Sequence, residues 1–163
     1  MLAKEMIIKK FEYNHWANKK LLEHATKITP EQWSDDNIEY SRGNIHQAMH
    51  HILIVEEMWL AMCEHHQRPT DLPTSETLST PESLIKYSEK VQNIILTYLN
   101  TLDEDKLKAS FESVSPSGKS YSLVIWHILN HVLYHSAQHR SEVAELLTRY
   151  GQSPGDIDFI DFV

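Results

Sequence analysis

Apolar side chains recur every three or four residues along four long stretches of this chain, a spacing typical of amphipathic helices rather than strands. The pattern predicts helices over about residues 2–27, 41–66, 81–102 and 122–150. Thr80-Pro81 is a strong helix start, and Gly151 and Pro154 follow the last helix as stop signals. The expected fold is therefore an all-α four-helix bundle in one domain, residues 1–163.

Shorter features fill the connections between these helices. Thr29-Pro30 begins a short helical turn that includes Trp33, and residues 67–80 form a polar loop. Residues 111–121 carry Ser115-Pro116-Ser117-Gly118 between apolar flanks, which predicts a small hairpin or irregular loop before the last helix. The final residues, 155–163, are too apolar for a solvated tail, so we expect them to pack on the helices.

Charge and hydropathy exclude several classes of partner. The formal net charge is −8, and the basic residues are scattered, whereas binding to DNA or RNA requires a basic footprint. No apolar run reaches the roughly 20 residues of a membrane span, and no export signal is visible, so a cytoplasmic protein is expected. Cys63 is the single cysteine, which excludes a disulfide within the chain and argues against a cysteine-based zinc site.

Histidine is unusually frequent, with eleven His against four Gly. In the last predicted helix, His127, His131, His135 and His139 recur every four residues. Side chains at this spacing lie about 6 Å apart along the axis, so neighbouring imidazoles can share one ion. Each step also turns about 40° around the axis, and a helical projection directs His135 and His139 toward the apolar side while the other two turn away.

Two histidines hold a metal weakly, so a third ligand should come from another helix. A projection of the second long helix makes His51 its best donor, and it places Glu56 unusually near the apolar side for a carboxylate. We expect Glu56 to accept an imidazole N–H or to join the ligands. Three neutral imidazoles, with the other positions left to water, form an open site suited to one Zn²⁺ or Ni²⁺ ion.

A purely structural interpretation competes with this hypothesis. An HxxxH pair is a modest signal, because paired histidines also make ordinary hydrogen bonds in a core. Tryptophan is expected to anchor the core rather than to stack on a ligand. The residues concerned are Trp16, Trp33, Trp59 and Trp126.

Several short motifs occur in a fixed order along nearly the whole chain. They are Tyr13-Asn14-His15-Trp16-Ala17-Asn18, then His51-Ile52-Leu53 with Glu56 and Trp59-Leu60, then residues 131–140 with His131, His135, His139 and Arg140, and then Leu146-Leu147 and Gly151. This ordered set closely resembles the DinB/YfiT-like family. The resemblance implies a four-helix bundle, often a homodimer, whose metal is held by one histidine of the second helix and two of the last. Carried over, these are His51, His135 and His139, the three that the projections select.

The resemblance also implies an activity. Characterised members transfer or isomerise substrates with low-molecular-weight thiols such as bacillithiol or mycothiol, so a metal-dependent thiol S-transferase is one hypothesis. Arg42, Arg140 and Arg149 are candidates to hold the carboxylates of such a thiol. A metal-dependent hydrolase would use the same histidines. The alternative from another class is a non-catalytic, stress- or damage-inducible metal-binding protein, which a coordinating Glu56 would favour.

Two adjacent residues depart from the family pattern. Ser141-Glu142 stands where members commonly carry Gly-Gln after the His-Arg pair. The change leaves all three predicted ligands in place and adds a carboxylate one turn beyond His139.

Overall fold

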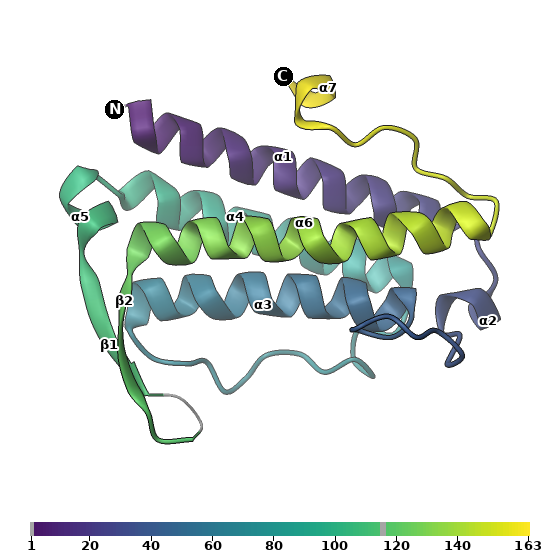
Figure 1. Ribbon diagram of the computed structural model, residues 1–163, viewed down its shortest axis with the longest axis horizontal. Helices are drawn as coiled ribbons and strands as arrows, with labels where there is room; N and C mark the ends of the chain where they lie inside the picture. Colours follow the sequence, from purple (N-terminus) through teal and green to yellow (C-terminus); the bar gives the residue numbers. More distant parts are fainter. Residues whose placement is uncertain (1, 115–116) are drawn as a thin grey trace.

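Four long helices lie side by side in the computed structural model, which describes residues 2–114 and 117–163 (Figure 1). They are α1 (Leu2–Ala25), α3 (Ile45–His65), α4 (Pro81–Thr101) and α6 (Ile125–Arg149). Both α1 and α3 pack against α4 and α6, so the four helices enclose one apolar core. The largest fully buried side chains come from all four helices: Phe11, Leu21, Leu22, Ile45, Met49, Ile52, Leu53, Leu60, Leu84, Ile95, Leu99 and Leu129. The predicted, mostly helical fold is confirmed.

Capping residues set where these helices begin. Asn44 precedes α3, where its side chain accepts a hydrogen bond from the backbone N–H of Gln47 and the Gln47 side chain accepts one from the backbone of Asn44. Thr80 caps α4 in the same reciprocal way, with Pro81 as its first residue. Such a box satisfies backbone donors that the first helical turn leaves unpaired. The cap of α3 thus fixes the start of the helix that carries His51.

A hairpin precedes the last long helix, as predicted. Strands β1 (Ser110–Val114) and β2 (Ser120–Val124) pair antiparallel, with Phe111 opposite Leu123. The predicted turn residues Ser115 and Pro116 lie outside the described residues, as does Met1. The predicted start of the last helix, at residue 122, is wrong because β2 pairs with β1 as far as Val124, and α6 begins at Ile125.

Two short helices complete the connections seen before the hairpin. Helix α2 (Pro30–Trp33) is the turn expected after Thr29. Helix α5 (Glu104–Lys108), capped by Asp103, was not predicted, because five residues are too few to show a helical repeat. Helix α1 ends at Ala25, two residues before the predicted limit.

The C-terminal segment packs on the outside of α1, as expected. In α7 (Phe159–Phe162), both phenylalanine rings contact Tyr13, and Phe162 also contacts Trp16. One predicted core anchor is wrong: Trp126, in the first turn of α6, is 45% exposed and lines a surface cavity beside α1 and α5 instead of the core. Among the described residues, no helix combines the length and hydropathy needed to cross a bilayer.

Candidate metal centre

Three histidines from two helices meet where α3 packs on α6. The Nε2 atoms of His51 and His135 lie 2.9 Å apart, and one ligand atom from each of His51, His135 and His139 falls within 4.8 Å of the others. Their ring centroids are separated by 4.6 to 5.1 Å. The structure thus brings together the three side chains selected from the sequence.

The spacing of these nitrogens fits a divalent transition-metal ion. Two imidazole nitrogens bound to one Zn²⁺ at 2.0–2.1 Å lie about 2.8–3.4 Å apart for bond angles between octahedral and tetrahedral values. The distance of 2.9 Å between Nε2 of His51 and Nε2 of His135 falls in this range. The donor set is also appropriate, because imidazole nitrogen suits zinc and nickel better than calcium or magnesium.

The surroundings keep two of these imidazoles neutral. Burial, together with the smaller effect of the positive charge of Arg42, lowers the pKa of His51 to about 4. Burial likewise lowers the pKa of His135 to about 4, with added repulsion from His139 and His131. A neutral imidazole keeps a nitrogen lone pair for a metal, so both side chains are in their ligating form near neutral pH.

A carboxylate orients the third imidazole. Nδ1 of His139 donates to Oε2 of Glu142 at 3.0 Å, and Ser41 donates to the other carboxylate oxygen at 3.2 Å. Because Nδ1 carries the proton, the lone pair of His139 lies on Nε2. A carboxylate that fixes the tautomer of a metal-binding histidine is a common outer partner of metal sites. Glu142 is the carboxylate that stands one turn beyond His139 in the sequence, and no role was predicted for it.

The expected role of Glu56 is wrong. Its Oε1 accepts hydrogen bonds from Nδ2 of Asn14 at 2.7 Å, from Nδ2 of Asn18 at 3.0 Å and from the hydroxyl of Ser136 at 2.8 Å. These partners lie toward α1 and the core, and none is an imidazole. A helical projection shows that a side chain points inward, but not which neighbouring helix it meets.

Glu56 belongs instead to a buried polar network. The guanidinium of Arg140 donates through Nη1 to the side-chain oxygens of Asn14 and Asn18, the same two residues that donate to Glu56. All of these side chains are buried. Ser136 and Arg140 directly follow the clustered histidines of α6 in sequence, so the network ties that helix to α1 and α3 beside the cluster.

The remaining histidines have other contacts. His46 and His50 bond the backbone carbonyls of Leu78 and Pro73, which holds the loop between α3 and α4. His131 is exposed and meets Trp59 edge-on, with ring centroids 5.6 Å apart. It therefore borders the cluster without joining it.

Of the three candidate arginines, one has a suitable position. Arg140 is buried, and Arg149 pairs with Glu145 at 2.8 Å. Arg42 is exposed and close enough to lower the pKa of two clustered histidines. Cys63 is no alternative nucleophile, because burial raises the pKa of its thiol to about 12.

Comparison with known proteins agrees with the resemblance seen in the sequence. A family model described as "DinB family" matches residues 1–163. The chain is also 20% identical, over 160 residues, to "Protein DinB" of Bacillus subtilis (strain 168). That match covers 95% of this chain and 92% of the other protein, so the likeness extends over the whole length of both.

Proposed function

The chain belongs to the DinB family, and we propose that it is an enzyme whose His51, His135 and His139 hold one divalent transition-metal ion, Zn²⁺ or Ni²⁺. The observation that carries the proposal is the 2.9 Å separation of two neutral imidazole nitrogens from different helices. Without an ion, one of these two groups must donate a proton to the other. With an ion, both lone pairs serve as ligands.

Three protein ligands leave coordination positions for a substrate. An ion of this kind lowers the pKa of a bound thiol or water and so supplies a nucleophile near neutral pH. Glu142 keeps the proton of His139 on Nδ1, which maintains the ligating tautomer. Arg42, at the edge of the cluster, is placed to hold a carboxylate of the substrate.

We propose a low-molecular-weight thiol as the substrate and an S-transfer as the reaction. The thiolate sulfur would form a bond to an electrophilic carbon of the second substrate, the leaving group would depart with its electron pair, and the thiol proton would pass to solvent. Hydrolysis of an ester by a water in the same position is the competing reaction. Arg42 supports bacillithiol as the thiol, because bacillithiol carries carboxylates and simple esters do not.

The non-catalytic alternative has less support. It predicts a closed coordination shell, and coordination of the ion by Glu56 would favour it. The carboxylate of Glu56 is engaged by Asn14, Asn18 and Ser136 instead, an arrangement that supports an open site. We also propose that the protein is a four-helix bundle that forms a homodimer in the cytoplasm. Sedimentation equilibrium tests the dimer, and cell fractionation tests the location.

The activity test compares zinc-loaded protein with the same protein after chelation. Bacillithiol and monochlorobimane report S-transfer by fluorescence, and p-nitrophenyl esters report hydrolysis by absorbance. We expect S-transfer that requires the metal and is lost in His135→Ala, and an increased KM for the thiol in Arg42→Ala. Ester hydrolysis without S-transfer would show that hydrolysis is the activity of this site. Metal-loaded protein that catalyses neither reaction would overturn the proposal that the protein is an enzyme.

A further inference from the structure

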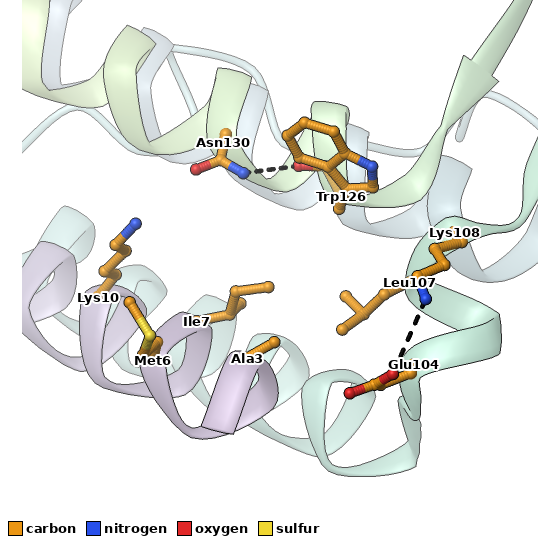
Figure 2. Close-up of a pocket in the computed structure, with 9 residues that line it drawn as sticks. All are labelled: Ala3, Met6, Ile7, Lys10, Glu104, Leu107, Lys108, Trp126 and Asn130. Atoms are coloured by element: carbon orange, nitrogen blue, oxygen red, sulfur yellow. Dashed lines mark hydrogen bonds and ion pairs between the residues drawn. The ribbon is translucent and has the colours of Figure 1, made fainter. Parts of the chain in front are cut away.

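A groove runs along α1 and α6, away from the histidine cluster, and its lining contains none of the three clustered histidines. Its larger part, a cavity of about 410 Å³, lies between α1, α5 and the first turns of α6 (Figure 2). A smaller cavity of about 220 Å³ continues between the two long helices to Phe159 of α7. Lys10 and Asn130 line both cavities, so the two parts are neighbours there.

The middle of the larger part is apolar, with Lys10 and Asn130 at one end and Glu104 and Lys108 at the other. Figure 2 shows Met6 and Ile7 on α1, across the groove from α6, whose first turn carries Trp126, with Leu107 of α5 toward the far end. Met6 is 51% exposed and Trp126 is 45% exposed, although both are large apolar side chains. An exposed apolar surface of this kind, set in a hollow, is typical of a binding site for an apolar group.

Positive charge gathers where the two parts adjoin. Lys10 and Arg140 both line the smaller cavity, and the lining described for that cavity contains no carboxylate. Among the described residues, Lys10 takes part in no ion pair, whereas Lys108 at the far end pairs with Glu104. Glu56 approaches Arg140 from the core side, so Lys10 supplies the unbalanced charge.

This charge is unusual for the molecule. The whole chain has a formal net charge of −8, so a groove in which the charge of Lys10 is not balanced by a carboxylate, next to an apolar stretch, is a local exception. An anionic head group would find Lys10 at the junction, and an attached alkyl chain would find the apolar part beginning at Ile7. A negatively charged membrane surface does not match, because most of the molecule would repel it.

We propose that this groove binds a single-chain amphiphilic carboxylate, such as a medium-chain fatty acid. The carboxylate pairs with Lys10, and the alkyl chain runs past Ile7 and Trp126 toward α5. This binding is separate from the proposed metal chemistry, since the two sites share no lining residue. A failure of one therefore leaves the other standing.

Isothermal titration calorimetry with decanoate tests the proposal on the whole chain. We expect saturable binding of one decanoate per chain. Hexanoate has four fewer methylenes, each worth about fourfold in affinity when buried, so it should bind at least about tenfold more weakly. The uncharged analogue 1-decanol should also bind more weakly than decanoate, because it lacks the charge that Lys10 recognises.

Two surface substitutions separate the head group from the chain. Lys10→Glu reverses the charge at the junction and should weaken decanoate binding about tenfold. Ala3→Trp fills the apolar part from an exposed position and should weaken binding to a similar extent. The matched control is Lys86→Glu, which makes the same charge change at an exposed residue of α4 and should leave the affinity unchanged. Circular dichroism checks that each variant is folded.

Three results would overturn the proposal. The first is an absence of saturable decanoate binding. The second is an affinity that neither Lys10→Glu nor Ala3→Trp reduces, which would mean non-specific adsorption. The third is a wild-type dimer that Ala3→Trp dissociates and that decanoate does not bind, because this face would then be covered by a second copy of the chain.

Discussion

The carboxylate of Glu142 accepts a hydrogen bond from Nδ1 of His139 at 3.0 Å, three residues earlier on the same helix. The side chain of His139 is 5% exposed and that of Glu142 is 22% exposed, so the pair is only partly open to solvent. The bond holds the ring in one orientation and one tautomer. It gives Glu142 an influence on the proposed metal site, although Glu142 is not one of the proposed ligands.

Replacing Glu142 should therefore weaken metal binding without unfolding the protein. We expect Glu142→Ala to reduce zinc affinity about 10- to 100-fold, because loss of an outer partner has this effect in other metal sites. Glu142→Gln keeps an acceptor oxygen, so its zinc affinity should fall by less than that of Glu142→Ala. Competition with a chromophoric chelator measures the affinities.

The control for this prediction is Glu145→Ala, one turn of α6 further on. Glu145 pairs with Arg149 on the surface and has no contact with the histidines. The zinc affinity of the Glu145→Ala variant should equal that of the wild type. Equal affinities for Glu142→Ala and the wild type would show that the hydrogen bond does not act on the site.

Metal content should depend on each of the three clustered histidines and not on their neighbour. We expect about one zinc or nickel ion per chain in wild-type protein purified without a nickel column, and a large loss in His51→Ala, His135→Ala or His139→Ala. His131→Ala is the matched control, since His131 lies one turn before His135 on the same helix but outside the cluster. Inductively coupled plasma mass spectrometry measures the content. An unchanged metal content in all three variants would make the cluster a packing feature.

The histidine cluster could be predicted because helical geometry alone decides it. His135 and His139 lie on a long, unbroken helix, so their directions follow from the turn per residue, and the wrong start of that helix does not alter them. His51 follows in the same way from α3. The hydrogen bond between His139 and Glu142 could have been predicted in the same way, because residues three apart on a helix are neighbours on its surface.

Other features depend on contacts that a single helix does not reveal. Glu56 points inward as predicted, but its partners Asn14 and Asn18 come from α1, and only the packed structure brings them together. The boundary between β2 and α6 is set by pairing with β1, which is likewise not local. The groove beside Lys10 needs α1, α5 and α6 in place at once.

Removal of Glu56 should destabilise the fold strongly. Glu56→Ala leaves the buried side-chain donors of Asn14 and Asn18 without their acceptor and leaves Arg140 without a compensating charge. We expect a loss of about 3 kcal/mol or more in the free energy of unfolding. Urea denaturation of metal-free protein measures it. The exposed Glu64→Ala, on the same helix, should change it by less than about 0.5 kcal/mol, and a similar small change for Glu56→Ala would contradict a structural role.

The pH dependence of stability should carry the signature of Glu56. Burial raises the pKa of this carboxyl above its usual value of 4.5, although hydrogen bonds from Asn14 and Ser136 and the charge of Arg140 oppose the shift. The folded protein therefore holds the Glu56 proton more tightly than the unfolded chain does. Its contribution to stability is fully present below the unfolded-state pKa and is lost as the pH rises through the folded-state pKa.

Glu56→Gln isolates this contribution, because glutamine does not titrate and the other groups cancel in the comparison. We expect the free energy of unfolding of the wild type, minus that of Glu56→Gln, to fall as the pH rises from about 4.5 and then to level off. Urea denaturation across a pH series measures the difference, and Glu64→Gln should give no such slope. A difference that rises with pH would mean that Arg140 and the amide donors outweigh burial, so that the folded-state pKa lies below the unfolded value.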